Sequence, residues 1–114
     1  MNLAGLMLYA KAQYAEAEPL MKRALAIDEA SYGAEHPNVA RDLNNLAQLL
    51  KDTNRLAEAE PLMKRALNLS LSSLGNEHPN TRTVMENYVI LLQIMGKAES
   101  EIIEVIGSLQ HGST

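Results

Sequence analysis

Two histidines stand in repeated surroundings and are the first residues of this sequence to suggest chemistry. The motif Glu35-His36-Pro37-Asn38 returns as Glu77-His78-Pro79-Asn80. Imidazole and carboxylate groups bind zinc, but a zinc site needs three or four converging ligands. Proline, in contrast, is favoured in the first turn of a helix, because its missing N–H would be unpaired there anyway. The two motifs therefore predict turns that lead into helices, and we expect no metal ion.

Other reactive groups are scarce in this chain of 114 residues. It has no cysteine, which excludes disulfides, thiolate nucleophiles and thiolate metal ligands together. It also has no glycine-rich phosphate loop, no supported serine, histidine and acid set, and no paired carboxylates on an obvious cleft. We therefore expect a protein that is not an enzyme and that needs no cofactor.

Three asparagines draw attention because they fall inside segments with helical periodicity. Asn44, Asn45 and Asn87 are poor residues for a helix interior, since the asparagine amide competes with the backbone for hydrogen bonds. Two interpretations are open. Either the amides hydrogen-bond the backbone of a ligand, or they bridge adjacent helices.

An internal repeat of 42 residues determines the expected architecture. The segment AEAEPLMKRAL occurs at residues 15–25 and again, unchanged, at residues 57–67, and Gly33 and Gly75 keep the same spacing. A more diverged third copy appears when residues 45–50 are laid on residues 87–92. A fixed period of this length is the signature of a repeat array.

Each period predicts two helices joined by a short turn. In the second period the two buried faces consist of Val39, Leu43, Leu46, Ala47 and Leu50, and of Ala59, Leu62, Met63, Ala66 and Leu67. Residues 52–55 lack this periodicity, so we expect antiparallel neighbours. Pro19 and Pro61 are expected in the N-terminal turns of second helices. The expected helices span residues 2–11, 15–31, 37–51, 56–73, 79–95 and 97–109.

These residues resemble the tetratricopeptide repeat, and within it the 42-residue variety found in kinesin light chains. The small-residue positions of the family match Ala47, Ala59 and Ala66. The resemblance implies an all-α fold, an α-solenoid of antiparallel helix pairs wound into a right-handed superhelix of about six helices. We expect one array of two and a half to three repeats over residues 1–110, followed by a flexible tail at residues 111–114.

The resemblance also implies a function, because in this family the first helix of each pair lines a concave groove that binds a protein or peptide segment. On the two expected first helices the polar face carries Arg41, Asn44, Asn45, Gln48, Thr83, Glu86 and Asn87. These seven residues are the predicted peptide-binding residues. The basic pairs Lys22-Arg23 and Lys64-Arg65 lie on second helices, where a solvated face is expected.

A second function remains open, in which the chain is a structural spacer or a self-associating scaffold. Ile102, Ile103, Val105, Ile106 and Leu109 spread apolar side chains broadly around the last expected helix, and large apolar patches often mark interfaces. The formal net charge of −4 argues against nucleic acid as a partner. No apolar run approaches the roughly 18 residues of a membrane span. We expect a soluble, cytoplasmic protein.

Overall fold

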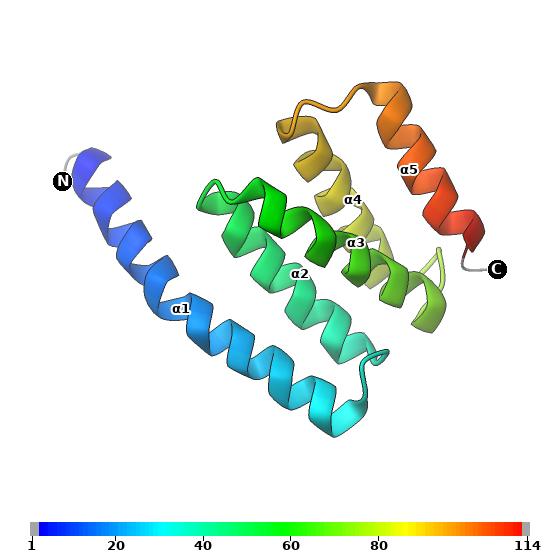
Figure 1. Cartoon of the computed structure of the whole chain (residues 1–114), viewed down its shortest axis with the longest axis horizontal. Helices are drawn as coiled ribbons and strands as arrows, with labels where there is room; N and C mark the ends of the chain where they lie inside the picture. The colour runs from blue at the N-terminus through cyan, green and yellow to red at the C-terminus, as the bar shows by residue number, and fades with distance from the viewer. Residues whose placement is uncertain (1–2, 113–114) are drawn as a thin grey trace.

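The structure is a computed structural model that describes the backbone of residues 3–112 and the side-chain surroundings of residues 13–110. Within that part of the chain all five elements are helices: α1 (Leu3–Tyr32), α2 (Pro37–Asp52), α3 (Leu56–Ser73), α4 (Pro79–Ile94) and α5 (Glu99–Gly112). They form an elongated layer of roughly antiparallel neighbours, 50 × 38 × 22 Å (Figure 1). The expected all-helical fold is confirmed for the described residues.

The centre of the molecule is the hairpin of α2 and α3, which make the broadest contact between any two helices. Leu43 and Ala47 of α2 and Ala59 and Met63 of α3 are fully buried, so the two predicted apolar faces pack against each other. Asn54 turns the chain with a positive φ of 62°, a conformation that asparagine tolerates better than most residues. The predicted turn is confirmed at residues 53–55, while Asp52 still belongs to α2.

The two repeated histidines cap the helices that follow them. His36 Nδ1 accepts a hydrogen bond of 3.1 Å from the backbone N–H of Asn38, and His78 Nδ1 accepts one of 3.1 Å from Asn80. Each imidazole thus satisfies one of the backbone donors that a helix N-terminus leaves unpaired. Pro37 and Pro79 begin α2 and α4. The prediction that these motifs are turns ahead of helices is confirmed.

Helix α4 is fixed to α3 by two buried side chains. Tyr88 is fully buried, and its hydroxyl donates a hydrogen bond of 2.8 Å to Glu60 Oε1 on α3. Thr81, also fully buried, donates from Oγ1 to the Ser70 carbonyl oxygen at 3.2 Å. Because both bonds lie on the same helix pair, the position of α4 along α3 is set at two points.

The first part of the chain differs from the expectation. Residues 2–11 and 15–31 were expected to form two helices, but α1 continues from Leu3 to Tyr32 as one helix of 30 residues. The physical reason lies at residues 10–17, which are alanine, lysine, glutamine, tyrosine and glutamate without glycine, proline or asparagine, so nothing there favours a turn over a helix. The predicted count of six helices is therefore wrong, and Pro19 lies inside α1 rather than in an N-terminal turn.

Helix α1 contacts α2 along one side and is held by ion pairs to neighbouring helices. Arg55, which precedes α3, bonds both Glu18 of α1 and Glu58. Arg65 Nη1 lies 3.4 Å from Glu29 Oε1. The pKa of Glu18 lies below its ordinary value because Arg55 and then Lys22 hydrogen-bond its carboxylate.

Helix α5 packs lightly at the other end of the molecule. Its contact with α4 is small compared with that between α2 and α3. Ile102 and Leu109 are buried, Val105 and Ile106 are partly buried, and Ile103 is 64% exposed, so part of the expected apolar surface is covered and Ile103 is the most exposed of the five. α5 includes His111 and Gly112, where a tail was expected to begin; Ser113 and Thr114 lie outside the described residues.

Candidate functional site

The seven predicted residues do not all lie together: three line one hollow beside α2, two line another, and Glu86 and Asn87 line neither. The first hollow, of about 290 Å³, lies where the N-terminal halves of α2 and α4 meet the end of α3. It is lined by Pro37, Asn38, Ala40, Arg41, Asn44, Ser70, Leu74, Asn80, Thr83 and Val84. We call it the α2–α4 groove. It contains three of the predicted residues, namely Arg41, Asn44 and Thr83.

The polar side chains of the α2–α4 groove are joined across the helices. Asn87 Nδ2 donates a hydrogen bond of 3.2 Å to Asn44 Oδ1. That bond uses one acceptor of Asn44 and one donor of Asn87, while each asparagine amide carries two N–H donors and a carbonyl oxygen. Asn44 and Asn87 therefore bridge adjacent helices, as one of the two interpretations of these asparagines expected. The N–H donors of the Asn44 amide are not used by this bond and lie at the groove.

Arg41 supplies the positive charge of the α2–α4 groove. Its side chain is 63% exposed, and Nη2 lies 3.5 Å from both Asp28 Oδ2 on α1 and Asp42 Oδ1 beside it on α2. Both contacts are at the long end of the ion-pair range, and exposed pairs of this kind contribute little to stability. The guanidinium is therefore held only weakly by its two neighbours.

The carboxyl group of Asp42 lies in an unusual setting next to Arg41. The Asp42 side chain is buried, and the structure gives its Oδ2 no hydrogen-bond partner among the described residues. Burial, followed by the hydrogen bond and charge of Asp28, raises the pKa of Asp42 to about 6, and Arg41 only partly opposes this rise. Burial disfavours the charged form, and two neighbouring carboxyl groups disfavour double ionisation.

The second hollow, of about 380 Å³, lies between α1 and the C-terminal half of α2. It is lined by Gln13, Tyr14, Ala17, Met21, Asn45, Gln48, Leu49 and Asp52, and we call it the α1–α2 hollow. Asn45 and Gln48 therefore face this hollow rather than the α2–α4 groove. The remaining predicted residue, Glu86, is exposed on α4.

Two residues of the α2–α4 groove were missed by the sequence analysis. Asn38 and Asn80 line it from equivalent positions at the starts of α2 and α4. Their repetition in the two Glu-His-Pro-Asn motifs was the available signal, but it was explained by the turns alone. The backbone N–H of each asparagine caps its helix through histidine, which leaves the amide side chain for other contacts.

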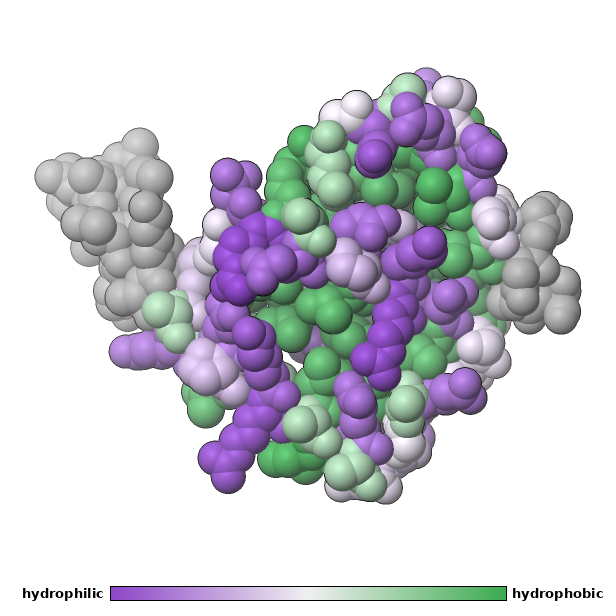
Figure 2. Space-filling view, in the orientation of Figure 1, coloured by the Kyte–Doolittle hydropathy of each residue, from purple (hydrophilic) through white to green (hydrophobic). Residues whose placement is uncertain are grey.

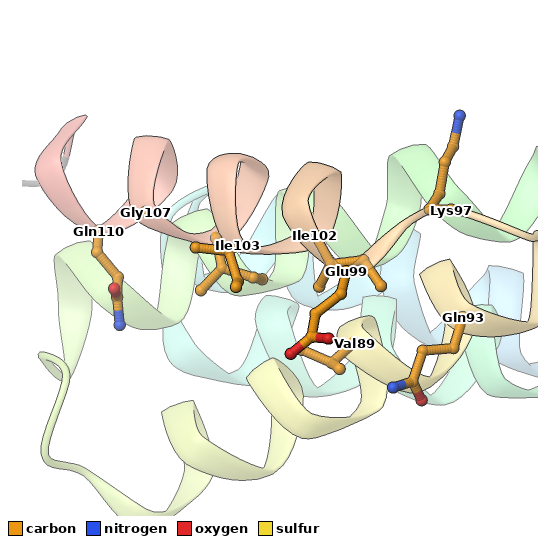
Figure 3. A pocket seen from close by; sticks show the side chains of 9 residues that line it. Val89, Gln93, Lys97, Glu99, Ile102, Ile103, Gly107 and Gln110 are labelled. Carbon is orange, nitrogen blue, oxygen red and sulfur yellow. The ribbon is translucent and has the colours of Figure 1, made fainter.

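A third hollow, of about 560 Å³, opens between α4 and α5. Figure 3 shows Val89 and Gln93 of α4 and Glu99 beside the space between the two helices, while Lys97 points away from it. In Figure 2 the surface over α4 and α5 shows apolar residues with hydrophilic ones among them. This hollow is larger than the α2–α4 groove, and none of the seven predicted residues lines it.

Across the described residues, no three acidic or histidine side chains converge as a metal site would require. In the same part of the chain, no helix combines the length and apolar character needed to cross a bilayer.

A comparison with protein-family models gives a match. A family model described as tetratricopeptide repeat matches residues 1–72, which is more than half of the chain and includes α1, α2 and most of α3. A comparison with curated proteins gives no match.

Proposed function

Because this chain belongs to the tetratricopeptide repeat family, whose repeats generally mediate protein–protein interaction, we propose that it binds an extended segment of another protein in the α2–α4 groove. In this proposal the helix pairs stack as a right-handed solenoid, of the 42-residue kinesin light chain-like variety, and α2 and α4 line its inner curve. The chain then acts by holding a partner, without catalysing a reaction.

The observation that carries the proposal is the lining of the α2–α4 groove. Ala40, Leu74 and Val84 provide an apolar floor, while amides and a hydroxyl from two different helices stand around it. An extended peptide presents both N–H and C=O groups along its backbone, and an asparagine amide can pair with either. The groove is therefore suited to an extended peptide that is bound through its backbone and that has small apolar side chains.

The repeat itself supports the proposal, because equivalent residues of two successive repeats line the same groove. Asn38 and Asn80 are separated by one period of 42 residues and lie in the same groove at the starts of successive first helices. An array that repeats a helix pair places equivalent side chains at regular intervals along one surface. Each further pair would add another asparagine in register with the guest.

The test selects peptides that bind the chain and then compares their affinity for the wild type and for groove variants. Random peptides displayed on phage are selected on the full chain, and the Kd of each selected peptide is measured by fluorescence polarisation. Thr83→Arg fills the groove from α4, and Asn80→Ala removes one lining amide. We expect Thr83→Arg to weaken binding by at least about tenfold, equivalent to about 1.4 kcal/mol, and Asn80→Ala to weaken it severalfold.

Ser108→Arg, which adds the same side chain at an exposed position of α5, is the matched control and should bind as the wild type does. Circular dichroism of each variant separates lost binding from lost folding. If the selected peptides bind Thr83→Arg as tightly as the wild type, the groove is not the binding site and the proposal is overturned.

A second function is favoured by one observation at the other end of the molecule. Ile94 of α4 and Ile103 of α5 are 53% and 64% exposed, and a further helix pair or a second chain would cover them. In this alternative the chain is a spacer or a self-associating scaffold that uses its C-terminal helix. Light scattering of Ile103→Glu tests it: a dimer that becomes monomeric supports the alternative, and an unchanged mass contradicts it.

A further inference from the structure

The α1–α2 hollow has the features of an open site that could bind a helix. The internal repeat allows α1 to be compared with α3 at a spacing of 42 residues. Ala59 and Met63 of α3 are fully buried, whereas their equivalents in α1, Ala17 and Met21, are only partly buried and line the hollow. The same residue types are covered in one repeat and open in the other, because among the described helices α3 packs against both α2 and α4, whereas α1 packs mainly against α2.

Two residues on the α2 side of the hollow also lack neighbours. Asn87 of α4 is bonded to Asn44 on the preceding first helix, but its equivalent Asn45 is exposed. Gln48 lines the hollow, and the structure gives its buried Oε1 no hydrogen-bond partner among the described residues. An unpaired buried amide oxygen is costly, so both α2 residues lack a neighbour that the next repeat provides.

The sequence contains a segment whose composition resembles that of a first helix, the kind of helix that would fill this hollow. Residues 2–7 read Asn-Leu-Ala-Gly-Leu-Met, and residues 45–50 of α2 read Asn-Leu-Ala-Gln-Leu-Leu. In α2 the four apolar members of this segment are buried against the rest of the bundle. The equivalent segment near the start of the chain therefore has the apolar pattern of a first helix, offset by 43 residues.

Within its own chain this segment does not reach the hollow. Residues 3–12 continue α1 as part of one unbroken helix, and Figure 1 shows the early turns of α1 standing apart from the other helices. Ten helical residues span about 15 Å, which is comparable with the half of α2 that borders the hollow. The segment and the hollow therefore belong to the same chain, but within one chain the segment lies away from the hollow.

We propose that the α1–α2 hollow binds residues 3–12 of a second copy of this chain. Two chains exchange these segments reciprocally, so that each α1 remains continuous and each segment lies against Ala17 and Met21 of the partner copy. An exchange of identical elements between copies is a symmetric and closed arrangement. The exchanged helix also brings polar side chains to Asn45 and Gln48, as α4 does for Asn44.

The test is sedimentation velocity of the full chain over a range of concentrations, with variants on each side of the contact. The wild type should sediment with twice the mass of one chain. Ala17→Arg obstructs the hollow and Leu6→Glu changes the guest segment, so each should give a single-chain mass. Ala26→Arg adds the same charge at an exposed position of α1 outside the hollow and should remain a dimer. Circular dichroism confirms that every variant is still helical.

A distance measurement distinguishes the second copy from the chain's own segment. The sequence has no cysteine, so spin labels attach only at Ala4→Cys and Ala30→Cys. With labelled chains diluted into unlabelled ones, a continuous α1 gives an intrachain separation of roughly 39 Å, at 1.5 Å per residue.

A separation below about 20 Å would mean that the segment folds back onto its own chain, which would overturn the proposal. A wild type that stays monomeric at every concentration would overturn it as well. So would a dimer that persists in both Ala17→Arg and Leu6→Glu.

Discussion

Asn87 donates a hydrogen bond to Asn44 at 3.2 Å, and this single bond connects two helices whose bonded residues are 43 positions apart in the chain. It links the first helix of one repeat to the first helix of the next. Because Asn44 also lines the α2–α4 groove, the bond lies at the edge of that groove and joins the two helices that form its walls.

The first prediction concerns this pair. Asn44→Ala and Asn87→Ala should each lower the free energy of unfolding by about 1 kcal/mol, the usual net value of a partly buried neutral hydrogen bond. The double variant should lose little more than either single one, because both remove the same bond. Urea denaturation measures all three. Strictly additive losses would show that the two amides do not interact in solution.

The second prediction concerns Asp42 and pH. Its pKa is about 6 in the folded chain and 3.8 in the absence of neighbours, so between about pH 4 and pH 6 the folded state holds more protons than the unfolded state. Stability therefore falls as the pH rises through this window. The cost at pH 7 is up to about 3 kcal/mol, from 1.36 kcal/mol per pKa unit.

Asp42→Asn should remove that pH dependence and stabilise the chain at pH 7, because the amide is neutral and can donate to Asp28. Urea midpoints at pH 4, 5, 6 and 7 provide the measurement. The control is Asp52→Asn at an exposed position, which should retain the wild-type slope. An Asp42→Asn variant whose stability still declines between pH 4 and 6 would contradict the assignment.

The third prediction concerns the bond between α3 and α4. Burial, together with the hydrogen bond to Glu60, raises the pKa of Tyr88 above its ordinary value, so the hydroxyl stays protonated and serves as a donor. Tyr88→Phe keeps the buried ring and removes the donor, and it should cost about 1 kcal/mol of stability. Tyr32→Phe, at a side chain that is 54% exposed, should cost almost nothing. Equal thermal midpoints for both variants would rule out the proposed contribution.

The fourth prediction concerns the histidine caps. His36→Ala and His78→Ala each remove the acceptor for one helix N-terminus and should cost about 1 kcal/mol each, as is typical for loss of an N-cap. Asparagine accepts the same backbone bond, so His36→Asn and His78→Asn should restore most of the loss. Thermal unfolding followed by circular dichroism is sufficient. Failure of asparagine to rescue would indicate that the ring contributes by packing instead.

The middle of the fold could be predicted from the sequence because several local signals agreed there. Around α2 and α3, the apolar spacing, the proline after His36 and the polar residues at 52–55 all favoured the same boundaries, and α2 and α3 match them within one residue. Such agreement between local preferences and the overall fold is what allows a pattern to specify a structure.

The start of the chain could not be predicted in the same way. The repeat indicated a turn near residue 12, but alanine, lysine and glutamine at that place favour a helix, and the helical preference prevails in α1. The predicted site was incomplete for a different reason. Periodicity places Asn45 and Asn44 on one polar face, but which neighbouring helix each faces depends on packing between repeats, and this separates them into two hollows.

The uneven packing of the helices has a consequence for how the molecule opens. Each helix touches mainly its neighbours, and the contact is broad between α2 and α3 but slight between α4 and α5. In such an array, stability is distributed along the chain rather than shared by a single core. Backbone amide protons of α5 should therefore exchange with deuterium well before those of α2 and α3, and the molecule should unravel from its C-terminal end inward.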